Sequence, residues 1–534
     1  MKKLKKTLCI LTAAATMLAA AGCAGKNENQ VSSGNLGDTY PMNGNATVTY
    51  WMQLNSALLT TETEMTNTPF AKGLQKATGI NIEYIHPSPG QVDESFNIML
   101  ASGSLPDIIE WNWYRLPGGP QKAIDNGYII SLNDVMDSYA PNLKKYLSDN
   151  PEIDKMVKTD EKDYYVFPFL RGDDLLLTYS GPAVRKDWLE DLNLPVPETI
   201  DDWTAMLRAF KTQKNAEAAL TYEMESLNSS APNSSECFIG AYGIKGGFYM
   251  EDGQVKFGPV QPAYKDYLAL MHLWYSEGLL DTNIADITSK ILDTNMLSGR
   301  SGAMVMSGGR MGKYLSAKPE NDPKFDLLGV KYPVLHKGDR AMFGQSDFNY
   351  ALGSSAAISA NCKNVEAAAR LLDYGYSEEG MRYYNFGEEG VSYRMEDGYP
   401  TYTDEIVKNP EGLAMTNALA RYVRAGYAGP FVQKKEYIEQ YYSTPQQRSA
   451  LEQWRDNDAT KYVMPLVTYS PEDSAKMANS MNEINTYVDE MRLRFIMGAE
   501  SLDHFDNFVN QIYQLGIEDV LAIQTKAVAN YNSR

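Results

Sequence analysis

The chain has few of the residues that usually hold metals or build disulfide frameworks. Its 534 residues include 4 histidines and 4 cysteines, which argues against a histidine-rich metal centre and against a disulfide-rich scaffold. Basic residues are also in deficit, with 49 Lys and Arg against 68 Asp and Glu and a formal net charge of -19. Such a field opposes binding to nucleic acid or to anionic lipid headgroups. We therefore expect no nucleic-acid partner, no metal and no cofactor.

The usual catalytic signatures are missing as well. The sequence has no HExxH, GxSxG or GxxxxGK[ST] motif, so the zincin, serine-hydrolase and P-loop classes lack their signature. Carboxylates are adjacent at 173–174, 201–202 and 388–389, but adjacency does not supply the ~5 Å or ~6.5 to 9.5 Å separations that glycosidases need across a sugar. The segment 281–286 begins like a calcium loop, but its sixth residue is an aspartate where glycine is required. We predict that the protein is not an enzyme, with a surface glycosidase as the alternative.

The N-terminus carries an export signal. Four lysines precede an apolar run over 8–21, and this run is shorter than the ~20 residues that span a bilayer. A charged region followed by a short apolar run is typical of a secretory signal, so residues 1–22 are the predicted signal peptide. Residues 20–23 read AAGC and resemble the lipobox of bacterial lipoproteins, which makes Cys23 the predicted lipidation site. The alternative is an ordinary signal peptide with an incidental cysteine.

The rest of the N-terminal region predicts a tethered protein. Residues 24–46 are rich in Gly, Asn and Ser, as in a flexible linker that follows the lipidated Cys23. No later hydrophobic stretch approaches membrane length. We expect a protein at the extracellular face of the cytoplasmic membrane, anchored by lipid alone. Cys237 and Cys362 are the cysteines of its body, and we expect two free thiols.

The body begins with alternating strand-like and helix-like segments. Residues 48–52, 81–85 and 106–111 have the patterns of strands, and amphipathic segments over 70–77 and 93–102 lie between them. This β-α-β-α-β order predicts an α/β fold with a parallel sheet, and ligands bind such sheets in the crevice outside the carboxyl ends of the strands. The candidate ligand contacts are therefore the residues near the ends of the first and third strands: Trp51, Gln53, Asn55, Glu110, Trp111, Trp113 and Tyr114.

A later passage, 185–203, predicts a well-capped helix and also carries a family resemblance. Thr199 and Asp202 have the spacing of a capping box. As a whole, the passage resembles the segment of extracellular solute-binding proteins of the carbohydrate ABC-transporter type in which a lysine-aspartate-leucine helix is followed by proline-threonine and then by aspartate and tryptophan. Residues 103–108, 299–304 and 364–380 resemble other parts of that family.

The C-terminal run 495–530 resembles the large lipoprotein subgroup of the same family in Gram-positive bacteria. The resemblance implies a two-lobed periplasmic-binding-protein-like fold of type II, with a doubly wound sheet in each lobe and a helical C-terminal extension. It also implies these boundaries: a first lobe of 47–170 plus about 350–392, a second lobe of about 171–345 plus 395–534, and hinge segments near 169–173, 336–349 and 391–395.

The function implied by the resemblance is capture and delivery. The protein would be the substrate-binding component of an ABC importer, would bind a carbohydrate between its lobes, with an oligosaccharide as the expected ligand, and would pass it to the permease subunits. We expect a monomer. A surface glycoside hydrolase and a binding protein for a peptide or another non-sugar solute remain alternatives.

Sugar binding makes specific demands on side chains. A sugar ring offers an apolar C–H face and a rim of hydroxyls, so a site needs an aromatic platform with donors and acceptors around it. The chain contains 36 tyrosines, and Trp111 and Trp113 are the predicted platform, unless they pack within their own lobe. Arg171 and Asp173 are predicted to hold a vicinal diol, with an interlobe salt bridge as the alternative. The remaining candidates are Arg310, Asp347 and Glu389.

Overall fold

The computed structural model describes residues 36–37, 39–43, 46–221, 223, 236–353, 355–424 and 428–534. The predicted signal peptide, Cys23 and most of the predicted tether lie outside these residues. None of the helices in the described ranges combines the length and apolar character that crossing a membrane requires. Cys237 and Cys362 are free thiols.

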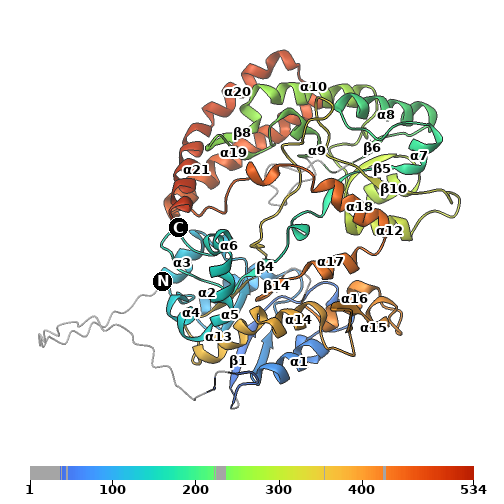
Figure 1. Ribbon diagram of the computed structural model, residues 1–534. Coiled ribbons are helices and arrows are strands. Elements are labelled where there is room, and N and C mark those ends of the chain that lie inside the picture. Colours follow the sequence, from blue (N-terminus) through green and yellow to red (C-terminus); the bar gives the residue numbers. More distant parts are fainter. Residues whose placement is uncertain are drawn as a thin grey trace, which may run out of the picture.

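Two lobes stand one above the other in Figure 1, and the first, lower lobe is built on a four-stranded sheet in the order β11-β3-β1-β2. β1 pairs in parallel with β2 and β3, which confirms the predicted β-α-β-α-β start, and β11 adds an antiparallel edge. The strands are β1 (Thr47–Trp51), β2 (Asn81–Ile85), β3 (Ile108–Trp111) and β11 (Ser355–Ile358). The helices of this lobe include α1 (Pro69–Thr78), α2 (Val92–Ser102), α3 (Gly119–Asp125), α4 (Asn133–Tyr139), α5 (Pro141–Asp149), α6 (Pro151–Met156), α13 (Val365–Asp373) and α14 (Glu378–Phe386).

Helix α1 shows how the sequence fixes these elements. The Thr68 side chain accepts a hydrogen bond from the Ala71 N–H and so caps the first turn. Gly79 ends the helix in the left-handed conformation at φ 73°, where any side chain would be strained. The short turn leads directly into β2, which brings β2 alongside β1.

The second lobe has a mixed four-stranded sheet in the order β10-β5-β9-β6. β5 is antiparallel to both β9 and β10, while β6 is parallel to β9. The strands are β5 (Ser180–Arg185), β6 (Leu220–Thr221), β9 (Ala303–Ser307) and β10 (Leu327–Gly329), with a separate hairpin of β7 (Phe248–Glu251) and β8 (Gln254–Phe257). The helices are α7 (Lys186–Asp191), α8 (Ile200–Gln213), α9 (Glu236–Ile239), α10 (Pro262–Ser276), α11 (Ser289–Leu297) and α12 (Gly308–Ser316). The predicted capping box of Thr199 and Asp202 is present at the start of α8.

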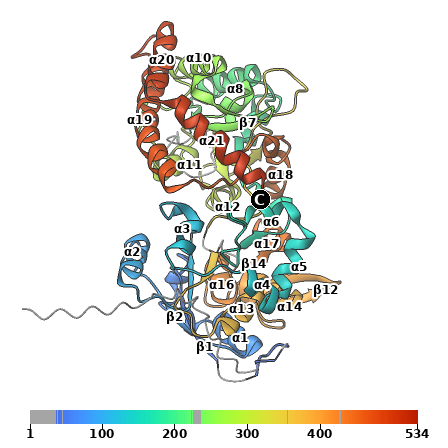
Figure 2. The same ribbon diagram turned by 90° about the vertical axis from the view of Figure 1, so that its left-hand side faces the viewer.

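The C-terminal part of the chain is helical, as predicted. α18 packs on β10 and β5, and α19 packs on α10 and α21, so these helices complete the second lobe. The end of α21 returns to the first lobe, where Tyr531 joins the core (Figures 1 and 2). These helices are α18 (Pro445–Trp454), α19 (Pro471–Ile496), α20 (Phe505–Gln514) and α21 (Ile517–Asn532).

The passages between the lobes run side by side. β4 (Phe169–Arg171) pairs in parallel with β14 (Phe431–Gln433), and Leu170 also forms a bridge with Tyr350 on the second passage. Two of the predicted hinge segments, near 169–173 and 336–349, overlap these passages.

The third predicted hinge, near 391–395, is displaced in the structure. After α14 the chain stays in the first lobe, because α16 packs against α1 and β14 pairs with β4. The return to the second lobe lies between α17 and α18. The intervening elements are β12 (Tyr393–Glu396), β13 (Tyr399–Tyr402), α15 (Asp404–Val407), α16 (Met415–Tyr422) and α17 (Lys435–Tyr441).

Candidate functional site

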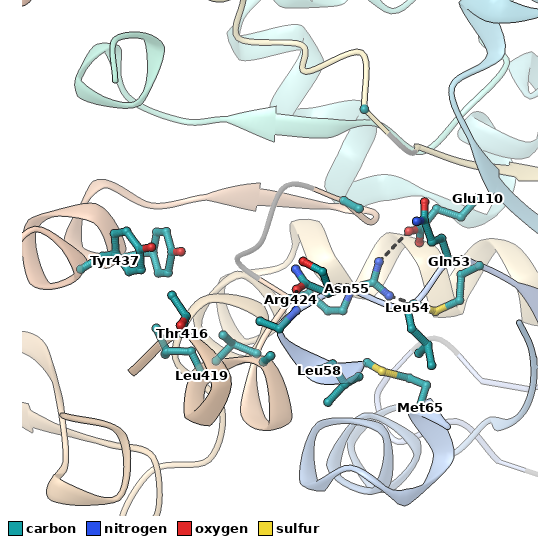
Figure 3. Close-up of a pocket in the computed structure, with 18 residues that line it drawn as sticks. Gln53, Leu54, Asn55, Leu58, Met65, Glu110, Thr416, Leu419, Arg424 and Tyr437 are labelled. Atoms are coloured by element: carbon teal, nitrogen blue, oxygen red, sulfur yellow. Dashed lines mark hydrogen bonds and ion pairs between the residues drawn. The ribbon is translucent and has the colours of Figure 1, made fainter. Parts of the chain in front are cut away.

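A pocket of about 520 Å³ opens in the first lobe at the carboxyl ends of β1 and β3. Its wall comes from the segment 52–58 after β1, from Glu110 in β3, and from residues of 416–441. Figure 3 shows these side chains converging from separate parts of the chain. The structure therefore has a pocket at the place where the strand order predicts a ligand-binding crevice.

Two of the predicted contacts lie where the chain leaves β1. Gln53 and Asn55 are exposed and line the pocket. The Asn55 Oδ1 accepts a hydrogen bond from the Ala57 N–H at 2.7 Å, which holds the amide in a local turn. The amide N–H groups of both side chains remain suitable donors for a ligand hydroxyl.

Glu110 anchors the buried end of the pocket through an ion pair. Its Oε1 lies 2.6 Å from the Arg424 Nη2, and the two side chains are 1% and 10% exposed. Its Oε2 accepts a hydrogen bond from the Tyr50 hydroxyl at 2.7 Å. The Arg424 Nη1 is 3.1 Å from the Met52 Sδ, a weak acceptor. Both carboxylate oxygens are thus engaged, while Arg424 keeps N–H donors beyond these contacts.

The electrostatics of this cluster follow from its burial. Burial and the Glu110 carboxylate both raise the pKa of Tyr50 well above its usual value, so its hydroxyl stays a donor. Burial is the largest single influence on the pKa of Arg424 and by itself would lower it, but the Glu110 carboxylate together with Tyr50, Tyr84 and Tyr384 outweighs this effect and the pKa rises. Arg424 is therefore charged at every physiological pH.

The opposite wall supplies apolar and aromatic surface. Tyr437 and Tyr441 on α17 stack with ring centroids 5.7 Å apart at an interplanar angle of 21°. Tyr441 is the more exposed of the two, and burial raises its pKa. The remaining apolar lining includes Leu54, Leu58, Met65, Leu419 and Val423. A pocket with apolar walls and a few convergent polar groups is the usual form of a small-ligand site.

The two tryptophans of the predicted platform do not line the pocket and instead pack within their own lobe, which is the alternative stated for them. Trp111 stacks on Phe96 with centroids 3.7 Å apart, and Trp113 meets the same ring edge-on, so both belong to the core of the lobe. Successive residues of a strand point to opposite faces, so with Glu110 directed into the pocket Trp111 is directed away from it. Trp51 packs near Phe96 in the same core.

Other predicted contacts also lie away from the pocket wall. Tyr114 is half-buried, and its hydroxyl donates to the Leu466 carbonyl oxygen at 3.4 Å. Arg310 lies on α12 of the second lobe and donates to the Ser289 hydroxyl at 3.1 Å. Glu389 is exposed just before β12.

The predicted diol-binding pair forms hinge contacts. Arg171 makes an ion pair with Asp347 at 2.7 Å, which is the salt-bridge alternative with a different partner. Asp173 instead accepts from the Leu175 N–H at 2.8 Å and caps the short helix Asp174–Leu177. Burial raises the pKa of Asp347, although Arg171 opposes this shift. None of the three lines the pocket.

Within the described ranges, no three His, Cys, Asp or Glu side chains are grouped as a metal site would require.

Four residues of the pocket were not predicted from the sequence: Arg424, Thr416, Tyr437 and Tyr441. Arg424 is the first residue of a glycine-containing run, RAGYAGP, which is a weak sign of a functional loop. Nothing in the sequence links it to Glu110, from which it is separated by 314 residues.

Two α/β lobes joined by several chain passages, with a pocket at the carboxyl ends of the first sheet, define a two-lobed ligand-binding protein. Residues 60–382 match the family described as bacterial extracellular solute-binding protein, and the chain belongs to this family. Members of the family are binding proteins.

Two relatives align with most or all of the chain. The chain is 24% identical over 581 residues to the fructooligosaccharide ABC transporter substrate-binding protein FusA of Streptococcus pneumoniae, covering 100% of this chain and 99% of the relative. It is also 24% identical to the lipoprotein LipO of Bacillus subtilis, over 77% of this chain and 79% of that protein.

A solved structure shares the fold. The HMO-binding ABC-transporter-associated solute-binding protein of Bifidobacterium longum infantis has a TM-score of 0.73 at 20% identity, over 92% of this chain and 100% of that one. The two-lobed α/β fold expected from the sequence is confirmed.

Proposed function

We propose that the protein is the substrate-binding component of an ABC importer and that it captures a carbohydrate, with an oligosaccharide as the expected ligand. The observation that carries this proposal is the pocket at the carboxyl ends of β1 and β3, where amides, a guanidinium and tyrosine rings converge. Support also comes from the family and from relatives whose names describe fructooligosaccharide and HMO binding.

The lining has the chemistry that a sugar needs. The amides of Gln53 and Asn55, the Thr416 hydroxyl and the free N–H groups of Arg424 are partners for sugar hydroxyls. Tyr441, with Tyr437 behind it, supports the apolar face of a ring. The volume of about 520 Å³ lies within the ~300–1,000 Å³ range of small-ligand sites.

Capture involves both lobes. A ligand first held in the first-lobe pocket favours closure only if the second lobe adds contacts in the closed form, because a ligand shifts such an equilibrium by its differential affinity. Arg310 on α12 remains the proposed second-lobe contact, with Glu389 and Tyr114 as weaker proposals. The closed form then docks on the permease subunits and releases the intact sugar.

The setting of the protein is part of the proposal. It acts without enzymatic activity, as a monomer, at the outer face of the membrane of a Gram-positive bacterium. Cys23 holds it there by lipid after removal of residues 1–22. Replacing Cys23 with alanine is expected to release the protein into the medium, and retention of the variant on the membrane would exclude this anchor.

Titration calorimetry with a panel of neutral oligosaccharides tests the binding function. We expect saturable binding with recovery of the chemically unchanged sugar. The double change Asn55→Ala and Gln53→Ala is expected to weaken binding at least about tenfold, or about 1.4 kcal/mol. Gln91→Ala, which removes another exposed amide of the same lobe, is the matched control. Release of smaller sugars would favour a glycosidase, and a thermal shift with peptides alone would favour a peptide-binding protein.

A further inference from the structure

The charges of the pocket cancel each other. Among the described residues that line it, Glu110 and Arg424 are the charged ones, and they are paired at 2.6 Å. Glu110 is 1% exposed, with its second oxygen held by Tyr50. The pocket therefore presents donors without a net charge, although one of its donors is a guanidinium.

We infer, on the basis of the proposed function, that this site selects uncharged oligosaccharides and rejects those that carry carboxylates. A hydroxyl can accept from the free N–H groups of Arg424 while the ion pair stays intact. A ligand carboxylate must either lie close to Glu110 or displace it from Arg424. Displacement leaves a carboxylate unpaired in a buried position, which strongly disfavours the complex. Glu110 is thus a specificity-determining residue as well as a structural partner of Arg424.

The variant Glu110→Gln tests this inference because it keeps the shape of the side chain and uncovers the charge of Arg424. Neutral fructo-oligosaccharides and trigalacturonate are titrated into the wild-type protein and the variant by calorimetry. We expect the wild-type protein to bind a neutral sugar and to bind trigalacturonate at least about a hundredfold more weakly. We expect Glu110→Gln to lower the ratio of the two dissociation constants, trigalacturonate over neutral sugar, at least about tenfold. Asp93→Asn, which breaks the exposed Arg115–Asp93 pair in the same lobe, should leave the ratio unchanged.

The outcomes separate the two proposals. If the wild-type protein binds trigalacturonate as tightly as any neutral sugar, the selectivity inference is overturned while sugar binding stands. If neither class binds, the proposed function fails and the inference fails with it. Circular dichroism shows whether Glu110→Gln is folded. If it is not, the same titrations are carried out with Arg424→Gln. That variant exposes the Glu110 charge and should reduce trigalacturonate binding further, and any gain would contradict the inference.

A second, independent observation concerns His86, which joins two parts of the pocket wall. Its Nδ1 lies 2.9 Å from the Met52 carbonyl oxygen, and its Nε2 lies 3.2 Å from the Met65 backbone nitrogen. The Met65 N–H is a donor, so Nε2 must be the unprotonated acceptor and Nδ1 carries the hydrogen. Both Met52 and Met65 line the pocket. Only a neutral imidazole can make both hydrogen bonds.

We propose that neutral His86 is a positioning residue that fixes the pocket wall, so that protonation of its ring weakens ligand binding. A second ring hydrogen would meet the Met65 N–H and break that contact. The groups that face the ring are the Tyr84 side chain, stacked at 6.1 Å, and the charges of Glu64, Glu110 and Arg424. Burial is the main cause that lowers the pKa of His86, and Arg424 adds to it, while the hydrogen bond to the Met52 carbonyl and the two carboxylates oppose it. Affinity is therefore retained at neutral pH and lost as the pH falls through this lowered pKa.

The pH profile of sugar affinity distinguishes positioning from mere packing. The dissociation constant of a neutral fructo-oligosaccharide is measured from pH 7.5 to 5.0 in the wild-type protein, in His86→Gln and in His86→Ala. We expect the wild-type affinity to fall with a limiting slope of about tenfold per pH unit below the pKa of His86. Glutamine can donate to Met52 and accept from Met65 without titrating, so His86→Gln should bind like the wild type at pH 7.5 and show a flat profile.

The alanine variant should bind weakly at every pH. His336→Gln, in an exposed loop of the second lobe, is the matched control and should keep the wild-type profile. The proposal is overturned if His86→Gln retains the wild-type pH dependence or if the wild-type affinity is constant over this range.

Discussion

Arg171 and Asp347 form an ion pair that ties together two passages of the chain between the lobes. The Arg171 Nη2 is 2.7 Å from the Asp347 Oδ2, with side chains 10% and 13% exposed. The Arg171 N–H also donates to the Asn349 carbonyl oxygen at 2.7 Å, and the Asp347 N–H donates to the Leu177 carbonyl oxygen at 2.8 Å. These two passages are therefore held together by one buried charge pair and by backbone hydrogen bonds on either side of it.

Asp347→Ala is expected to lower the free energy of unfolding by about 3–5 kcal/mol, because it leaves the buried Arg171 without a counter-charge. Urea denaturation followed by tryptophan fluorescence measures the loss. Asp93→Ala removes a partner from an exposed ion pair and should lower stability by at most about 1 kcal/mol. Equal losses of unfolding free energy in the two variants would show that the Arg171–Asp347 pair stabilises the protein no more than an exposed ion pair does.

A substitution of Trp113 tests whether this side chain stabilises the core of the first lobe or contacts the ligand. Trp113 is buried beside Phe96 and Trp111. Trp113→Ala should therefore lower the free energy of unfolding by about 3–5 kcal/mol through the cavity it leaves. Sugar affinity of the folded fraction should remain within about twofold of the wild type. Urea denaturation and calorimetry measure the two quantities.

Tyr441→Ala should give the reverse result, with weaker sugar binding and a smaller change in stability, because this ring is partly exposed at the pocket. A Trp113 variant that is stable but does not bind sugar would restore the tryptophan as a ligand platform.

Parts of both lobes could be predicted because their signals are local. The Gly79 that ends α1 and the capping box of Thr199 and Asp202 each depend on residues a few positions apart. The alternation of strand-like and helix-like segments was enough to predict the parallel strands and the crevice at their carboxyl ends. Gln53 and Asn55 line the pocket because they directly follow β1.

The rest of the site depends on distant contacts. Arg424 reaches Glu110 only because the chain stays in the first lobe until α17, whereas the predicted return lay near 391–395. The choice between Glu110 and Trp111 depended on which face of β3 meets the pocket, and a buried strand with apolar residues on both faces does not reveal this. The two buried charge pairs, Glu110–Arg424 and Arg171–Asp347, each join residues that are far apart in the sequence.

Asp373 should make the stability of the protein depend on pH. Its carboxylate is buried and accepts hydrogen bonds from the Asn142 and Leu143 N–H groups at the start of α5. Burial, opposed by these hydrogen bonds, raises its pKa to about 6. Between the unfolded pKa of ~3.9 and this value, the folded state binds a proton that the unfolded state does not. This contribution to stability is therefore greatest at low pH and is lost as the pH rises through about 6.

Asp373→Asn removes the titration. The wild-type free energy of unfolding, relative to that of the variant, should fall by up to about 3 kcal/mol between pH 4 and pH 7. Asp137→Asn, at an exposed carboxylate of the same lobe, is the control and should follow the wild type. Parallel pH curves for the wild type and Asp373→Asn would mean that Asp373 is ionised throughout.

The end of α21 should act as a clamp between the lobes. The side chain of Arg534, just after the last residue of α21, is 0% exposed, pairs with Asp160 of the first lobe at 2.7 Å and donates to the Thr468 hydroxyl at 2.9 Å. The same helix packs on α19 of the second lobe. Arg534→Ala should lower the free energy of unfolding by about 1.5–3 kcal/mol, the range for charged hydrogen bonds, and should speed amide exchange near Thr468. Lys526→Ala breaks the more exposed pair between Lys526 on α21 and Asp473 on α19. Its loss of unfolding free energy should stay below about 1 kcal/mol, with unchanged amide exchange. If both variants behave alike, Arg534 does not clamp the lobes.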